Sequence, residues 1–285
     1  RVPDSLFSVK LDSGRKRLLK QAEVKGVFSS SDYKVDRKFI TARDGTSVPV
    51  SLIYKRSKFN KNKNPLFVYG YGSYGNSIDA GFSSSRLSLL DRGFIFAIAH
   101  IRGGQELGRS WYEDGKIFNK LNTFYDFIDV TKGLLKKGYG DSNRVYAGGG
   151  SAGGLLMGAI VNMEPKLYNG IISNVPFVDV ITTMSDPSIP LTTGEYSEWG
   201  NPANKDEFEY ILQYSPYDNI DSHEYPSILV TAGLWDSQVQ YYEPAKYVAK
   251  LRDYNKSKNP ILMKVNMTAG HSGVSGRFES LKEVA

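Results

Sequence analysis

Residues 145–161 read VYAGGGSAGGLLMGAIV, and the fold expected for the chain follows from this segment. Residues 144–147 are typical of a buried strand and residues 155–161 of an apolar helix, so the glycines between them mark a sharp strand-to-helix turn. Ser151 stands at its tip within the pattern Gly-x-Ser-x-Gly, the spacing of a nucleophilic serine. Its small neighbours leave room for a strained backbone, and the start of the helix offers free N–H groups to an oxyanion.

Two other interpretations of a glycine-rich turn have to be weighed. A dinucleotide-binding loop needs Gly-x-Gly-x-x-Gly after the first strand of its unit, with an acid about 20 residues further on. Residues 148–153 match that spacing loosely, but no acid stands at the corresponding strand end, and the chain has no Walker lysine. A turn that only packs a helix against a sheet stays open until a base and an acid are found.

The rest of the chain alternates strand and helix patterns, which predicts an α/β-hydrolase fold with a mostly parallel central sheet. An antiparallel N-terminal hairpin is expected before it, because residues 33–40 and 48–54 alternate and flank an Asp-Gly turn. Residues 5–15 are expected to form a strand and a turn without an evident partner, and residues 179–202 a loop or short helices. Further strands are expected at 66–69, 94–99, 170–175, 227–232 and 261–265, and helices around 87–90, 122–138 (capped by Asn122) and 244–251.

The chain has three histidines, of which one lies where a general base is needed. His271 stands in a glycine-flanked loop just after the last predicted strand, whereas His223 lies in a polar loop and His100 follows a buried strand. Asp236 comes directly after a predicted buried strand, at the carboxyl end where open α/β sheets place functional groups. The order Ser151, Asp236, His271 is the α/β-hydrolase order of nucleophile, acid and base. It predicts acyl transfer through a Ser-His-Asp triad.

Composition argues against several other classes of protein. The 285 residues include no cysteine, which rules out disulfides, zinc-thiolate sites and a cysteine nucleophile. The formal charge of +6 comes from short basic runs typical of a solvated surface, so no nucleic-acid partner is expected. No apolar run approaches the roughly 18 residues of a membrane span, and the first residues do not resemble a signal peptide. We therefore expect a cytoplasmic protein with no membrane partner, and no metal or other cofactor.

Several segments together resemble the prolyl oligopeptidase family of serine peptidases. They are residues 69–75 (YGYGSYG), 102–104 (RGG), 149–154 (GGSAGG), 175–179 (VPFVD), 192–196 (TTGEY), 199–202 (WGNP), 214–219 (YSPYDN) and 236–239 (DSQV). The similarity runs from about residue 30 to residue 280. The resemblance implies an α/β-hydrolase domain that cleaves short peptides after Arg or Lys. It also implies an oxyanion hole formed by the Tyr71 hydroxyl and the Ala152 backbone N–H.

The same resemblance implies a set of substrate contacts. Glu195 matches the position that pairs with a basic P1 side chain, and Asp79 matches a position linked to a second basic subsite. Glu198 and Gln238 are further expected contacts. Where the family pattern has two companion acids and an arginine, this chain has Ser197, Gly81 and Gln238. A preference for dibasic peptides therefore does not follow from the resemblance.

The resemblance also implies that the chain is part of a longer protein. Members of the family carry a seven-bladed β-propeller over the active site, and residues 1–25 resemble its last strand and the exit from it. Residues 26–285 then form the peptidase domain, with residues 281–285 at the start of a shortened terminal helix. The expected partners are that propeller and short basic peptides.

Three alternatives remain at this point. They are a prolyl-specific oligopeptidase, a carboxylesterase for small esters, and a hydrolase-like scaffold used only for binding. The triad does not separate esters from amides, because the acyl transfer to Ser151 is the same. An acid at Glu195 argues against both the apolar pocket of a lipase and the aromatic pocket of a prolyl-specific enzyme.

Overall fold

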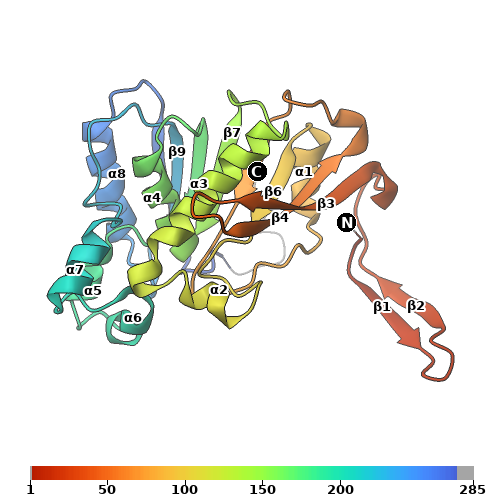
Figure 1. Ribbon diagram of the computed structural model, residues 1–285, viewed down its shortest axis with the longest axis horizontal. Helices are drawn as coiled ribbons and strands as arrows, with labels where there is room; N and C mark the ends of the chain where they lie inside the picture. Colours follow the sequence, from red (N-terminus) through yellow and green to blue (C-terminus); the bar gives the residue numbers. More distant parts are fainter. Residues whose placement is uncertain (1, 275–285) are drawn as a thin grey trace.

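An eight-stranded sheet forms the centre of the computed structural model, which describes residues 2–274 (Figure 1). The strand order is β10-β9-β8-β7-β5-β6-β4-β3. All neighbours from β10 to β6 run parallel, and β4 and β3 continue the sheet antiparallel. The mostly parallel sheet and the hairpin at its edge are as predicted. The strands are β3 (Tyr33–Thr41), β4 (Ser47–Lys55), β5 (Leu66–Tyr69), β6 (Ile95–Ala99), β7 (Val145–Gly150), β8 (Gly170–Asn174), β9 (Ser227–Gly233) and β10 (Ile261–Asn266).

Helices cover both faces of this sheet because its strands are apolar on both sides. In β6 the residues Ile95, Ala97 and Ala99 join the core beneath α3, α4 and α8, whereas Phe96 and Ile98 join a second core beneath α1. The helices are α1 (Ser84–Asp91), α2 (Arg109–Glu113), α3 (Leu121–Lys136), α4 (Ala152–Met163), α5 (Val180–Ser185), α6 (Thr192–Trp199), α7 (Lys205–Leu212) and α8 (Tyr242–Tyr254). In Figure 1, α5, α6 and α7 gather at the lower left, beside one end of the sheet. Among residues 2–274 no helix is both long and apolar enough to span a bilayer.

The strand order brings distant parts of the sequence to one edge of the sheet. On one side of β5 the chain proceeds through β6, and on the other through β7, β8 and β9. The strand order thus reverses direction at β5. Open α/β sheets usually bind their ligands in the crevice at the carboxyl ends of the strands beside such a point. The loops after β5, β7 and β9 therefore meet at one place.

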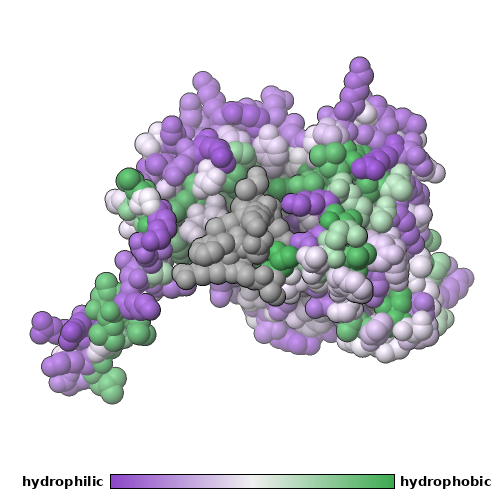
Figure 2. Space-filling model, turned by 180° about the vertical axis from the view of Figure 1, so that it is seen from behind, coloured by the Kyte–Doolittle hydropathy of each residue, from purple (hydrophilic) through white to green (hydrophobic). Residues whose placement is uncertain are grey.

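Residues 2–27 form a separate structure, which corrects the expectation that the first strand has no partner. β1 (Ser5–Val9) pairs antiparallel with β2 (Lys16–Gln21), a strand that the charged sequence KRLLKQ did not reveal. The hairpin projects away from the sheet and carries hydrophobic side chains on its surface (Figures 1 and 2). Those exposed by 46% or more are Leu6, Phe7, Val9, Leu11, Leu18 and Leu19.

One further expectation needs correction. Asn122 does not cap α3, which begins at Leu121. Its side-chain amide instead donates to the carbonyl of Asp114 at 3.0 Å. The stretch expected as a loop or short helices contains α5 and α6, and α2 and α7 were not predicted. These elements have five to eight residues, too few for a hydrophobic period to repeat. The predicted helix start at residues 281–285 lies outside the described residues.

Candidate active site

Ser151 lies at the tip of the turn between β7 and α4, in a strained backbone conformation. Its φ of 56° and ψ of −117° are rare for a residue with a side chain. The turn is held because the Ser151 N–H donates to the carbonyl of Asn174 at 2.9 Å, and the Phe177 N–H donates to the Ser151 carbonyl at 3.2 Å. Strain of this kind needs such support, and it directs the side chain away from the helix and the strand.

The glycines around Ser151 are required by close approach of the backbone. A Cβ on Gly149 would lie 2.3 Å from the carbonyl oxygen of Gly153, and one on Gly154 would lie 2.4 Å from the Pro176 side chain. Any side chain at these two positions would force the turn apart. The sequence pattern that marks the turn is therefore a consequence of its packing.

Asp236 and His271 are in direct contact, as the sequence order predicts. The Nδ1 atom of His271 lies 2.7 Å from Oδ2 of Asp236. The Asp236 side chain is almost fully buried, and Oδ1 accepts the backbone N–H groups of Gln238 and Val239, both at 2.9 Å. The carboxylate is thus held on both oxygens. This fixes the imidazole with Nδ1 toward the acid and leaves Nε2 for chemistry.

The pKa of Asp236 is lowered even though the group is buried. Desolvation opposes ionisation, but the hydrogen bond to His271 and the backbone N–H groups of Val239 and Gln238 outweigh it. Asp236 therefore stays ionised at neutral pH and can stabilise an imidazolium.

Gly233 allows the His271 loop to approach the end of β9. A Cβ there would lie 2.6 Å from the carbonyl oxygens of both Ala269 and Gly270. The Trp235 N–H donates to the Ala269 carbonyl at 3.0 Å, which ties the loop to the strand end that carries Asp236. β9 and β7 are separated by β8 alone, so the strand ends carrying Asp236 and Ser151 lie roughly 10 Å apart.

A cavity of about 280 Å³ opens beside Ser151. It brings together five of the residues predicted from the sequence, which are Tyr71, Ser151, Ala152, Glu195 and Gln238. The other lining residues are Tyr74, Phe177, Thr183, Met184, Ile189, Leu191, Thr192, Trp199 and Val239. The cavity is thus an aromatic and aliphatic pocket with one carboxylate in its wall, adjoining a serine.

Glu195 is half-buried on α6, and its carboxylate is held at one oxygen. Oε2 accepts the Tyr74 hydroxyl at 2.6 Å and the Trp199 indole N–H at 2.8 Å. Among residues 2–274 no hydrogen bond is made to Oε1. A cation entering the pocket would find an oriented, anionic acceptor.

Tyr71 and Ala152 line the cavity beside Ser151. Tyr71 follows β5, and the space beside its ring and backbone is kept clear by Gly153, where a Cβ would come within 3.4 Å of Cδ2 of the tyrosine. Burial raises the pKa of the Tyr71 hydroxyl, so it remains a proton donor at neutral pH. Ala152 is the first residue of α4, so its N–H has no acceptor within the helix.

Two predicted contacts, Glu198 and Asp79, do not line this cavity. Glu198 is buried, and its two oxygens accept the Tyr74 backbone N–H at 2.9 Å and the Tyr112 hydroxyl at 2.6 Å. Asp79 is exposed on the loop after β5. Gln238 reaches the cavity from the loop that also supports Asp236.

The sequence pattern of the prolyl oligopeptidase family matches residues 80–285. The chain belongs to the prolyl oligopeptidase family. It is 56% identical to dipeptidyl aminopeptidase BI of Pseudoxanthomonas mexicana, over 100% of this chain and 39% of that protein. The chain thus spans about two fifths of the length of this curated relative.

Solved structures of oligopeptidase B share the fold throughout. The enzyme from Leishmania major superposes with a TM-score of 0.96 at 48% identity, over 99% of this chain and 39% of that one. The closed form from Trypanosoma brucei, with covalently bound antipain, gives 0.95 at 46% identity, over 99% and 40%. The α/β-hydrolase fold and the resemblance predicted from the motifs are confirmed.

In this member of the prolyl oligopeptidase family, several residues at the site were missed from the sequence. Tyr74, Trp199 and Phe177 line the cavity, and Tyr112 and Lys120 lie behind it. The only available signal was their place in or near the family motifs. Their contacts join segments far apart in the sequence, such as the loop after β5 and α6, so spacing along the chain does not reveal them.

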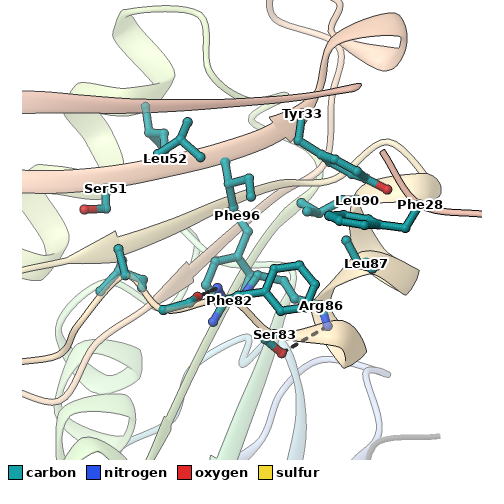
Figure 3. Close-up of a pocket in the computed structure, with 15 residues that line it drawn as sticks. Phe28, Tyr33, Ser51, Leu52, Phe82, Ser83, Arg86, Leu87, Leu90 and Phe96 are labelled. Atoms are coloured by element: carbon teal, nitrogen blue, oxygen red, sulfur yellow. Dashed lines mark hydrogen bonds between the residues drawn. The ribbon is translucent and has the colours of Figure 1, made fainter. Parts of the chain in front are cut away.

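A second, smaller cavity lies away from Ser151, between β4, β6 and α1 (Figure 3). Its volume of about 30 Å³ leaves space for little more than a water. Ser51 lines it, and its hydroxyl lies 2.8 Å from Nε2 of the buried His100. Ser51 is in the middle of β4, and the backbone groups of β4 pair with β3 and β6. The Ser51–His100 pair therefore has no two free N–H groups beside it that could form an oxyanion hole.

Proposed function

We propose that Ser151, His271 and Asp236 form the catalytic triad of a serine peptidase that cleaves short peptides after Arg or Lys. The observation that carries the proposal is the carboxylate of Glu195 in the wall of the cavity that also contains Ser151. A basic P1 side chain in this cavity would pair with Glu195 and place its own carbonyl beside the serine.

The reaction follows from the roles of the three groups. Neutral His271 takes the proton of the Ser151 hydroxyl through Nε2 as the serine oxygen attacks the carbonyl carbon. The oxyanion is bound by the Ala152 N–H and the Tyr71 hydroxyl. The C–N bond then breaks, and His271 protonates the leaving amine. Water, activated by the same histidine, hydrolyses the acyl-enzyme and releases the acid.

Replacing Glu195 by glutamine is expected to lower kcat/KM for an Arg reporter peptide about 100-fold, or ~3 kcal/mol, because the P1 cation loses its charged partner. Rates on a matched Phe peptide should change little. Glu224→Gln removes the same charge from an exposed loop and is the control. Equal rates of the parent on Arg and Phe peptides would contradict the proposed specificity.

The arrangement of Glu195 also predicts how Arg compares with Lys. Because Oε2 already accepts two hydrogen bonds and Oε1 accepts none within residues 2–274, a guanidinium gains little over an ammonium. We expect kcat/KM for Arg and Lys reporters to lie within about tenfold, as a single contact allows. The same reporters with Pro at P1, and a small ester, test the prolyl-specific and carboxylesterase alternatives.

Replacing Tyr71 by phenylalanine is expected to lower kcat roughly 100- to 1000-fold with little change in KM, since the hydroxyl acts on the oxyanion and not on the bound substrate. Single-turnover acylation of Arg reporters measures this. Tyr254→Phe, an exposed position on α8, is the control. A loss confined to KM would assign Tyr71 to substrate binding instead.

A second candidate function is removal of dipeptides from a free N-terminus. It is favoured by the 56% identity to a protein named dipeptidyl aminopeptidase BI. Such an activity needs an acid for the substrate's α-amino group as well as the acid for P1. Reporter peptides with a basic P1 residue decide between the two. Faster cleavage of a free dipeptide than of its acetylated form favours the exopeptidase, and the reverse favours the oligopeptidase.

We also propose that residues 1–25 belong to a further, N-terminal domain such as the predicted β-propeller. Support comes from the projecting β1–β2 hairpin, whose apolar residues are exposed and whose two edges are free for strand pairing within the described structure. The relative with 56% identity is also longer than this chain. An intact mass of the native protein near 31.8 kDa would contradict this proposal. The cytoplasmic location stays a prediction.

A further inference from the structure

A lysine is fully buried behind the P1 cavity. Lys120, just before α3, is 1% exposed, and its Nζ donates to the carbonyl of Gly72 at 2.6 Å and to Oγ of Ser73 at 2.8 Å. Nζ also lies 5.0 Å from the ring centroid of Trp199. Among residues 2–274 no carboxylate forms an ion pair with it. A buried cation satisfied by a backbone carbonyl, a hydroxyl and an aromatic face is costly to keep, which points to a positional role.

The loop that Lys120 holds carries both halves of the site. Tyr71, the expected oxyanion donor, precedes Gly72, and Tyr74, which binds the Glu195 carboxylate, follows Ser73. Gly72 has a φ of 74° and Tyr74 a φ of 60°, so the loop contains two left-handed residues. The tyrosine, unlike the glycine, is strained there and must be held by its surroundings.

Two buried charged side chains hold this loop. Lys120 binds the carbonyl of Gly72, and Glu198 accepts the N–H of Tyr74. Lys120 also packs on the ring of Trp199, whose indole N–H donates to Glu195. The lysine thus contacts both the loop after β5 and α6, the two elements that form the P1 wall.

We propose that Lys120 is a positioning residue that fixes the loop at residues 71–74 against α6. This one buried cation thereby determines the positions of both the oxyanion donor Tyr71 and the P1 acceptor Glu195. The proposal rests on the proposed function of these two residues. Lys120 does not line the cavity, so it acts through the loop and through Trp199 and not by touching substrate.

The protonation of Lys120 offers a way to test this without changing the fold. Burial lowers the pKa of Lys120 to about 8, although the charge of Glu198 favours the protonated form. Above that pH the neutral amine donates weaker hydrogen bonds and no longer balances Glu198. The acid whose charge acts on Lys120 is Glu198 on α6, and Glu195 lies on the same helix. Burial raises the pKa of the tyrosines that adjoin these acids, the loop or the start of α3, so they keep their protons near pH 8; they are Tyr71, Tyr74, Tyr112, Tyr210 and Tyr214.

The experiment compares Lys120→Met and Lys120→Arg in the full-length gene product, with kcat and KM for N-acylated Arg and Phe reporters. At pH 7, Lys120→Met should lower kcat/KM for the Arg reporter about 100-fold, through a lower kcat and a higher KM. A displacement of about 1 Å at the site has an effect of this size. Lys120→Arg should recover most of this loss. Between pH 7 and 9.5 the parent should lose kcat/KM as Lys120 deprotonates, and Lys120→Arg should not, because arginine stays charged.

Lys136→Met, at an exposed position on α3, the helix that Lys120 precedes, is the matched control. Thermal unfolding shows whether each variant is folded. If Lys120→Met does not fold, the activity of Ser73→Ala and the loss of kcat/KM by the parent between pH 7 and 9.5 still test the proposal. Both measurements leave the lysine in place. Parent-like kcat and KM in a folded Lys120→Met, or the same alkaline loss in parent and Lys120→Arg, would overturn the proposal. Equal rates of the parent on Arg and Phe would instead contradict the proposed specificity itself.

Discussion

Replacing Ser151 by alanine is expected to lower kcat about a million-fold, the effect of removing the nucleophile from a serine triad. The rest of the site should stay intact, because the neighbouring glycines and the hydrogen bonds of the turn do not involve the hydroxyl. Alanine has the same left-handed backbone cost as serine, so the unfolding temperature should be that of the parent. Loss of turnover with an unchanged fold would therefore report chemistry alone.

Labelling with a fluorophosphonate probe checks this directly. The parent should gain the mass of one phosphonyl group, and Ser151→Ala should gain none. Ser142→Ala, an exposed serine before β7, should label like the parent. Labelling of Ser151→Ala at the parent's rate would show that another nucleophile carries the reaction and would refute the assignment of the triad.

Replacing Asp236 by asparagine should lower kcat about 10,000-fold while the fold stays intact. An asparagine amide facing His271 would donate to Nδ1, which places the imidazole proton on Nε2 and removes its basicity toward Ser151. The amide oxygen can still accept the backbone N–H groups of Gln238 and Val239, which Asp236 accepts through Oδ1. The loop is therefore expected to keep its geometry.

Kinetics and thermal unfolding over a range of pH test both parts of this prediction. Because the pKa of Asp236 is lower in the folded than in the unfolded chain, its ionisation stabilises the fold above the unfolded pKa of about 3.9. That contribution is lost as pH falls through the folded pKa, so the unfolding temperatures of parent and variant should converge in strongly acidic solution. Asp253→Asn, exposed on α8, is the control. A loss of kcat below tenfold would contradict the role of Asp236.

Local signals were sufficient for the elements that form the frame of the site. The glycine-rich letters around Ser151 predict the turn because close backbone contacts at Gly149 and Gly154 exclude side chains there. Asp236 could be placed because a functional acid follows a buried parallel strand directly. His271 could be placed because only three histidines compete and one stands in a glycine-flanked loop.

Signals of this kind failed where a contact partner is distant in the chain. β2 is charged and exposed, so nothing in its residues reveals that it pairs with β1. Glu198 was expected at the substrate because acids near Glu195 resemble family contacts, yet it is buried against Tyr74 and Tyr112. Which side chains of a short helix face a cavity depends on the residues that pack against the helix. The sequence of the helix alone does not predict this.

The amino-acid sequence was enough to predict the strand-to-helix turn at Ser151, the order of the proposed nucleophile, acid and base, and the mostly parallel sheet, because each depends on local backbone sterics or on short-range hydrophobic patterns. The hydrogen bonds that hold Glu195 arise only on folding, since its two donors come from the loop after β5 and from α6. Folding also places Lys120 between those elements. Burial and hydrogen bonding between distant segments set the charge and direction of a side chain, and both arise only when the chain has folded.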